Sequence, residues 1–187
     1  MFGFMRKMYF TIGLMTIFAT AVADGAMKLF TIENFSDGHS IHLLPFVDFI
    51  LHRNPGITGD IPVPMWIITP ITLYVILFLI DRISLQYRER KIITLSMIAI
   101  IAGAMNNFID RIMNGFTTDY LMFFHTSIIN FSDVLIFGGV MIILLYNKNN
   151  PHTLCTIIPK PPPTKQYGVV SRLFLSIVRT IRNSSHR

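Results

Sequence analysis

Four long apolar runs set the pattern of hydrophobic and polar positions along the chain. They span residues 8–23, 63–80, 92–109 and 128–146, and Asp133 is the only charged residue within them. An α-helix needs about 20 residues to cross the roughly 30 Å of hydrocarbon in a bilayer. No alternating pattern of about ten residues repeats along the chain, as it would in a membrane β-barrel. The pattern therefore predicts an all-α membrane protein, a bundle of four transmembrane helices.

The first run permits a second interpretation, that of a cleaved secretory signal. Basic residues precede it, and it ends in Ala21-Val22-Ala23, a small-residue sequence typical of a cleavage site. Asp24 and Lys28 nevertheless follow at a spacing of four, where they can pair on one continuing helix that reaches Phe30. Cleavage would also leave three spans and move one end of the chain across the membrane. We therefore expect the first run to remain as a transmembrane helix.

Composition and charge give the class of protein and its orientation. The chain has 52% hydrophobic and only 14% charged residues, whereas a soluble domain has about 25% charged residues. Intrinsic disorder is excluded for the same reason. If the N-terminus is cytoplasmic, the inner segments 1–7, 81–91 and 147–187 contain two, four and seven of the sixteen lysines and arginines. This bias predicts a multi-pass inner-membrane protein with both termini in the cytoplasm.

Carboxylates gather at the outer ends of the spans in this orientation. Asp24 lies near the end of the first span, Asp110 near the end of the third, and Asp133 at the start of the fourth. Asp119 lies in the loop between the last two. Ionisable groups at membrane depth are costly and are usually paired or functional. Asp24 with Lys28 fits either an ordinary helix-end pair or a functional site. Asp119 and Asp133 have no lysine or arginine within five positions, which favours a functional role.

The outer loop of residues 31–62 is expected to form a small strand-rich cap on the membrane surface. Glycines and prolines mark turns there, with apolar residues between them. Its candidate metal ligands are His39, His42, His52, Asp48 and Asp60. Their spacing matches no compact zinc motif, and the single cysteine adds none. We expect no metal and no cofactor.

The C-terminal segment has a different character from the spans. Residues 148–168 contain Pro159 and Pro161-Pro162-Pro163, which predict a stiff extended linker. Residues 169–187 form a basic tail, in which positions 169–183 have the periodicity of an amphipathic helix. Such a helix beside a membrane protein favours the anionic inner leaflet, and a partner-binding helix is the alternative. We expect no nucleic-acid partner.

Five short motifs resemble those of the bacterial lipoprotein signal peptidases, the signal peptidase II family, in order and spacing over residues 8–146. Residues 103–111 resemble the family's small-residue run that closes in N-x-x-D-R, and residues 115–120 its G-(aromatic)-V-x-D-F segment. Residues 130–133 resemble N-x-A-D, residues 24–28 resemble D-x-x-x-K, and residues 54–56 resemble the N-x-G of the outer loop. Asn106 stands where the family usually has Gly, and Ser132 where it has Ala.

The resemblance implies an intramembrane aspartic endopeptidase domain over residues 1–147, with its active site at the outer face. It implies that Asp119 and Asp133 are catalytic, one as an ionised base and one as a protonated acid. The residues implied to bind substrate or orient this pair are Asn54, Asn107, Asp110, Arg111 and Asn130. Those implied to support the site structurally are Asp24, Lys28 and Gly103. The substrate would be a prolipoprotein with a diacylglyceryl-modified cysteine, cut just before that cysteine by a monomeric enzyme.

Two other functions fit parts of the pattern. A small proton-coupled transporter could use Asp119 and Asp133 as a relay, but its carboxylates would be spread across the bilayer. No helix is broken at its midpoint by paired Gly or Pro, as transporter sites often require. A scaffold that recruits partners through its tail would need no carboxylates at the outer face. The clustering of these residues therefore favours the peptidase.

Overall fold

The computed structural model of the chain describes residues 2–35, 39–57, 61–86, 90–150 and 157. The chain divides into two compact units, Met1–Thr153 and Leu154–Arg187, and the fold below is that of the first unit. The predicted linker of residues 148–168 and the basic tail of residues 169–187 lie outside the described residues, apart from 148–150 and 157.

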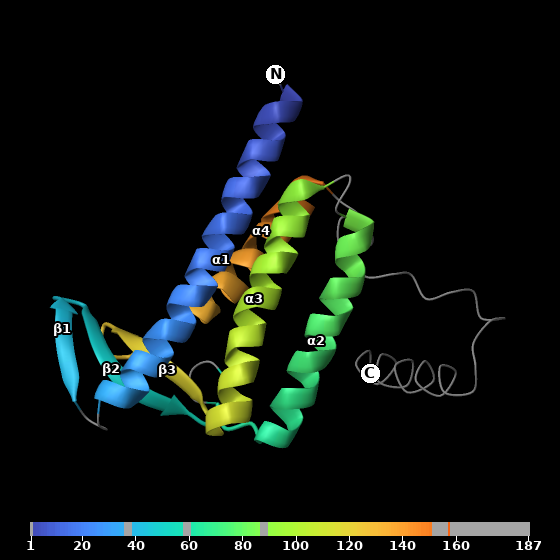
Figure 1. Cartoon of the computed structure of the whole chain (residues 1–187). Helices are drawn as coiled ribbons and strands as arrows, with labels where there is room; N and C mark the ends of the chain where they lie inside the picture. Colours follow the sequence, from blue (N-terminus) through green and yellow to red (C-terminus); the bar gives the residue numbers. More distant parts are fainter. Residues whose placement is uncertain (1, 36–38, 58–60, 87–89, 151–156, 158–187) are drawn as a thin grey trace, which may run out of the picture. The chain divides into compact units, whose positions relative to one another are not determined.

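Four long helices form the bundle, as the apolar runs predict (Figure 1). They are α1 (Phe2–Asn34), α2 (Met65–Gln86), α3 (Lys91–Asn114) and α4 (Phe131–Asn149). Each is long and apolar enough to cross a membrane. The third is the central helix, because it packs against each of the other three and half of its span is buried. Large apolar side chains such as Phe18, Trp66 and Phe137 remain exposed on the bundle, as expected for a surface that meets lipid.

Glycines bring the backbones of α3 and α4 close together. A Cβ atom added at Gly103 would lie 2.4 Å from the Ser132 carbonyl oxygen, and one added at Gly139 would lie 2.7 Å from that of Ser96. Small residues permit such close approach between transmembrane helices, where packing rather than hydrophobicity drives association. This contact fixes the first turn of α4 against the middle of α3.

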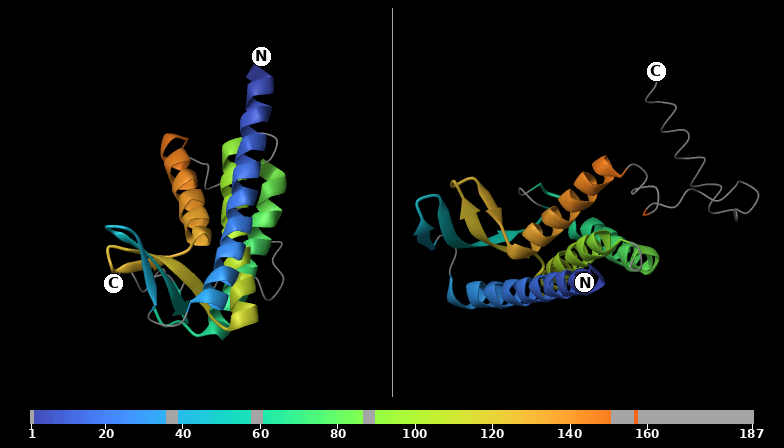
Figure 2. Two further views of the ribbon diagram at one scale, coloured as in Figure 1. Left: turned by 60° about the vertical axis from the view of Figure 1, so that its left-hand side comes forward. Right: turned by 90° about the horizontal axis from the view of Figure 1, so that it is seen from above.

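A four-stranded antiparallel sheet lies beside the C-terminal end of α1 in both views of Figure 2. Its strands, in sheet order, are β1 (Ser40–Leu44), β2 (Val47–Asn54), β3 (Thr117–Phe123) and β4 (Ser127–Ile129). The pairing of β2 with β3 joins the segment before α2 to the segment before α4, and it places His52 opposite Asp119. Phe35, Phe49, Leu51 and Tyr120 form a buried cluster between the sheet and α1.

The boundaries differ from the sequence expectation in two places. The strands do not come from residues 31–62 alone, because β3 and β4 follow α3, so the description all-α is too narrow. The first helix continues to Asn34, so the loop begins later than residue 31. The fourth apolar run begins within β4, at Ile128 and Ile129, whereas the helix itself begins at Phe131, capped by Asn130 and close to Asp133 as predicted.

Candidate active site

Asp119 and Asp133 are joined through the side chain and backbone of Asn130. The Asn130 side-chain amide donates to Asp119 Oδ1 at 2.6 Å, and its backbone N–H donates to Asp133 Oδ2 at 3.4 Å. In return, the Asp133 backbone N–H donates to Asn130 Oδ1 at 2.9 Å, which completes a capping box at the start of α4. Asn130 thus bridges Asp119 on β3 and Asp133 on α4.

Each carboxylate also receives a second amide. Asn54, at the end of β2, donates from Nδ2 to Asp119 Oδ2 at 3.0 Å. Asn107, on α3, donates from Nδ2 to Asp133 Oδ1 at 3.0 Å. The Asn130 amide also donates to Asn107 Oδ1 at 3.3 Å, so the three amides and two carboxylates form one network. Buried carboxylates need such donors, because burial removes those that water would supply.

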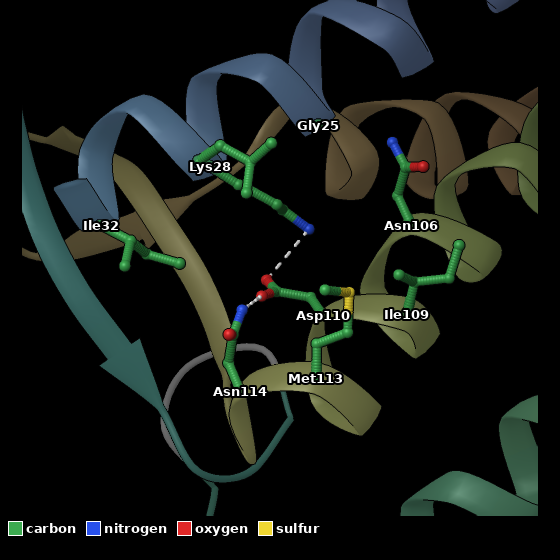
Figure 3. Close-up of a pocket in the computed structure, with 9 residues that line it drawn as sticks. Gly25, Lys28, Ile32, Asn106, Ile109, Asp110, Met113 and Asn114 are labelled. Atoms are coloured by element: carbon green, nitrogen blue, oxygen red, sulfur yellow. Dashed lines mark hydrogen bonds and ion pairs between the residues drawn. The ribbon is translucent and has the colours of Figure 1, made fainter.

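Lys28 supplies the positive charge next to this network. Its ammonium group donates to Asn107 Oδ1 at 2.6 Å and lies 3.2 Å from Asp24 and 3.4 Å from Asp110. Figure 3 shows the Lys28 side chain reaching from α1 to Asp110 on α3, with Asn114 bonded to the same carboxylate. Lys28 and both aspartates are almost fully buried. The side chain of one lysine therefore connects the carboxylates of Asp24 and Asp110 to the amide that holds Asp133.

Asp110 and Asp24 accept further donors from the elements that carry the candidate catalytic pair. Asp110 accepts the Thr118 backbone N–H at 2.6 Å and the Thr118 hydroxyl at 3.2 Å. Asp24 accepts the Tyr120 hydroxyl at 2.9 Å and the Ser132 hydroxyl at 2.6 Å. The carboxylates of Asp110 and Asp24 thus hold the residues on either side of Asp119 and the residue before Asp133.

Arg111 lies at the edge of the network, next to the loop that follows β2. Its Nη2 donates to the Gly56 carbonyl oxygen at 3.4 Å, and the Gly56 N–H donates to Asn54 Oδ1 at 2.9 Å. A Cβ atom at Gly56 would lie 2.0 Å from the Ile61 carbonyl oxygen, so only glycine fits at this turn. The Nε atom of Arg111 has no hydrogen-bond partner among the described residues. This nitrogen is buried, so the contact of the guanidinium group with the loop is made through Nη2.

Burial raises the pKa of Asp119 to about 7. The charge of Asp133 raises this pKa further, whereas the hydrogen bonds from Asn54 and Asn130 and the charge of Lys28 oppose the shift. The desolvation of a carboxylate outweighs these donors because it penalises only the ionised form. Asp119 is therefore close to half-protonated at neutral pH.

Of the candidate metal ligands of the cap, only His42 and Asp48 contact each other among the described residues. His42 and His125 contact the two oxygens of Asp48 at 2.5 and 2.9 Å, and His39 lies against Phe35 instead. His52 is on β2 opposite Asp119, and Asp60 lies outside the described residues. Within the described part of the chain, no group of three or more His, Cys, Asp or Glu side chains could hold a metal ion.

The structure thus gathers all the residues that the sequence motifs single out into one cluster, together with Gly103 beneath Ser132. Four further participants were not expected from the sequence: Asn106, Thr118, Tyr120 and Ser132. Asn106 donates to the Ala21 carbonyl oxygen at 2.7 Å and to Asp24 at 3.2 Å. The available signal was their position, since each is a polar residue next in sequence to a motif residue.

Comparison with known proteins places the chain among characterised sequences. A family model described as signal peptidase (SPase) II matches residues 16–147. A protein named lipoprotein signal peptidase from Beijerinckia indica subsp. indica is 33% identical over 145 residues, which cover 72% of this chain and 86% of the relative. One of the same name from Bartonella tribocorum is 33% identical over 139 residues, covering 71% of this chain and 83% of the relative. These relatives give no support to a transporter.

The fold also has a solved counterpart. The structure of a bacterial membrane enzyme, determined by the in meso method at 2.3 Å resolution, superimposes with a TM-score of 0.64 at 22% sequence identity. The match covers 75% of this chain and 92% of that protein. The spans and the small sheet therefore belong to a fold already seen in a membrane enzyme.

Proposed function

The chain belongs to the signal peptidase II family, and from that premise we propose that Asp119 and Asp133 are its catalytic pair, in an aspartic endopeptidase that cuts diacylglyceryl-modified prolipoproteins just before the lipidated cysteine. The observation that carries the assignment is the Asn130 bridge, in which one residue contacts both carboxylates. Peptide hydrolysis by two carboxyl groups needs them close together, with one proton between them.

The division of labour follows from that shared proton. The ionised carboxylate takes a proton from water as the water oxygen attacks the scissile carbonyl carbon. The protonated carboxyl donates to the carbonyl oxygen, and a tetrahedral intermediate forms. As the carbon–nitrogen bond breaks, the leaving amine takes a proton from the pair, and the carboxylic acid product departs. The pKa of Asp119 near 7 suits a group that both accepts and donates a proton near neutral pH.

The surrounding residues divide into two groups by their contacts. Asn54, Asn107 and Asn130 already donate to the carboxylates, which supports a role in orienting the pair. Asp110 is fully engaged by Lys28, Asn114 and Thr118, so its contacts favour support of the site over direct substrate binding. Arg111 interacts by charge with both carboxylates and holds the Gly56 carbonyl oxygen, which suits it to orient the pair and the loop after β2 toward an extended substrate.

The orientation of the helices in the membrane determines the side on which the proposed reaction takes place. The chain is a multi-pass inner-membrane protein, and the bias of basic residues supports an orientation with both termini in the cytoplasm. The catalytic pair then lies at the outer face, where a lipid-anchored cysteine would be held at the edge of the hydrocarbon. The whole site is built within one chain, which is consistent with a monomeric enzyme.

The test is cleavage of a diacylglyceryl-modified prolipoprotein by the full-length protein in detergent, with the unmodified precursor as a second substrate. The wild-type protein should cut only the modified one. Asp119→Asn and Asp133→Asn, nearly isosteric but without a titratable proton, should each lower turnover by more than about 100-fold. Asp81→Asn, at an exposed carboxylate on α2, is the matched control and should leave turnover unchanged. Retention of more than about a tenth of wild-type turnover in either site variant would overturn the assignment.

A further inference from the structure

Each catalytic aspartate has a neighbour in sequence that contacts the same buried carboxylate, Asp24. Tyr120 follows Asp119 on β3, and Ser132 precedes Asp133 in the first turn of α4. Tyr120 donates its hydroxyl to Asp24 Oδ1 at 2.9 Å. Ser132 donates its backbone N–H to Asp24 Oδ1 at 3.2 Å and its hydroxyl to Oδ2 at 2.6 Å. Asp24 thus contacts both elements that carry the pair.

The geometry separates these contacts from the reacting face. Successive side chains on a strand point to opposite faces, so the Tyr120 ring points away from Asp119. That ring is fully buried against Phe49 and Phe131, with centroids 5.7 Å away in each case. Its hydroxyl also accepts the Phe131 backbone N–H at 3.2 Å. The Tyr120 hydroxyl therefore joins β3 to both Asp24 and the start of α4.

Asp24 itself has two further polar partners, one on α3 and one on its own helix. Asn106 on α3 donates to Oδ2 at 3.2 Å, and Lys28, one turn later on α1, lies 3.2 Å from the same oxygen. Asp24 has no solvent-exposed surface. A buried carboxylate with this many donors cannot move without leaving one of them unsatisfied, which is costly in a dry interior. It is therefore a fixed reference point for β3 and α4.

On the basis of the proposed function, we propose that Tyr120 and Ser132 are positioning residues for hydrolysis, whose hydroxyls fix the separation of Asp119 and Asp133 by sharing Asp24. Asn130 holds the two carboxylates from the reacting side, and Asp24 holds their neighbours from the opposite side. Without either hydroxyl, Asn130 still bridges the two carboxylates. However, β3 or α4 loses one hydrogen bond to Asp24 and can shift relative to the other. Displacements of about 1 Å at a reacting centre can cost about 100-fold in rate.

The experiment measures kcat, KM and the pH profile of prolipoprotein cleavage for Tyr120→Phe, Ser132→Ala and the double variant, as full-length proteins. Each single variant should lower kcat about tenfold with KM within about twofold of wild type. Because both hydroxyls act through one carboxylate, the double variant should lose less than the product of the single losses. Thr94→Ala removes another fully buried hydroxyl, bonded only to its own helix, and should change neither kcat nor the profile.

The pH profile distinguishes positioning from a purely structural role. The charged or titratable groups around the pair are Asp24 and Lys28 from α1, His52 opposite Asp119 on β2, and Asp110 and Arg111 from α3, and the substitutions alter none of them. Burial raises the pKa of the Tyr120 hydroxyl, so it stays neutral throughout the assay range. If the rising or falling part of the pH–rate profile shifts along the pH axis in a folded variant, the separation of the two carboxyl groups has therefore changed.

Unchanged kcat and an unchanged profile in the folded double variant would overturn the positioning role. A loss of activity that only follows a loss of folded protein, as judged by thermal unfolding, would overturn it as well. If the double variant does not fold, Ser132→Ala alone carries the test. Asp119→Asn is measured alongside: activity in that variant contradicts the catalytic pair, whereas an inactive Asp119→Asn with normal hydroxyl variants contradicts only the positioning role.

Discussion

Asp119 combines opposing demands in one side chain. It is almost fully buried, which favours the protonated form, yet it accepts two amide hydrogen bonds, which favour the ionised form. Because burial has the larger effect, its pKa in the folded protein is about 7, against 3.8 for an ordinary aspartate. The burial of Asp119 therefore lowers the stability of the folded state at neutral pH. It also gives the side chain a proton that can be released and regained near that pH.

The first prediction is a dependence of stability on pH that Asp119→Asn removes. Below pH 4 both states of the wild-type protein keep the proton. As pH rises from about 4 to about 7, the unfolded state releases it while the folded state retains it, so the free energy of unfolding falls. The slope is at most about 1.4 kcal/mol per pH unit, and above pH 7 the contribution is constant.

The measurement is thermal unfolding of both proteins in detergent between pH 4 and 8. The stability of Asp119→Asn relative to wild type should increase up to about pH 7 and then level off. Asp81→Asn, at an exposed carboxylate, should show no such trend. A difference between Asp119→Asn and wild type that is the same at every pH would contradict the raised pKa.

At this scale the sequence predicts the motif residues but not their partners. Asp119, Asp133 and the three asparagines follow from the resemblance of short motifs to those of the signal peptidase II family. The contacts of Tyr120 and Ser132 with Asp24 span up to 108 positions, and no spacing rule connects such distant residues. They depend on the packing of α1 against α4, which is a property of the folded chain.

Two helical glycines provide a matched test at the scale of elements. Gly103 on α3 lies where a Cβ atom would meet the Ser132 backbone, whereas Gly25 on α1 has nothing within 4 Å of its Cβ position. Gly103→Ala should destabilise the protein by about 1–3 kcal/mol, because the α3–α4 contact must open. Gly25→Ala should be neutral or stabilising by up to about 1 kcal/mol, since alanine favours the helix.

Thermal unfolding of the two variants checks this pair, and cleavage activity adds a second comparison. Gly103→Ala should also lower kcat, because Ser132 and Asp133 share the displaced turn. Equal stability of the two variants would show that the close approach of α3 and α4 is not needed.

The helices were predictable because hydrocarbon demands long apolar runs, and such runs appear in the sequence. The strands after α3 were not, because Thr117–Phe123 lacks a clean alternation and its pairing partner β2 is distant in sequence. The start of α4 was predicted near Asn130 and Asp133, although the apolar run itself begins at residue 128, in β4. The Asn130 and Asp133 spacing is the local signal that marks the true start, since it is the pattern of a capping box.

For the molecule as a whole, the distribution of basic residues predicts which ends of the helices face the cytoplasm. After replacement of the single Cys155 by serine, a cysteine at exposed Ser127 in β4 should react with an impermeant maleimide added to intact cells. A cysteine at exposed Lys148, near the end of α4, should react only after the membrane is permeabilised. The reverse pattern of labelling would invert the topology and place the catalytic pair in the cytoplasm.

The basic tail, which lies outside the described residues, is predicted to be peripheral to catalysis. Deletion of residues 151–187 should leave cleavage in detergent within about twofold of wild type, because roughly 30 Å of hydrocarbon separate the two faces. A peptide of residues 167–187 should bind anionic vesicles, with about 1 kcal/mol from each basic residue, and should be released by salt. Equal binding to neutral vesicles, or loss of cleavage by a folded truncated protein, would refute this role.

The contact between Asp24 and Ser132 also limits how early in biosynthesis the site can assemble. The two residues are 108 positions apart, so Asp24 on the first helix can accept the Ser132 hydroxyl only after the start of the last helix has been synthesised. Until synthesis reaches the first turn of α4, the growing chain holds only Asp119 of the proposed catalytic pair. Hydrolytic activity therefore arises late in synthesis, after the ribosome has produced nearly all of the membrane domain.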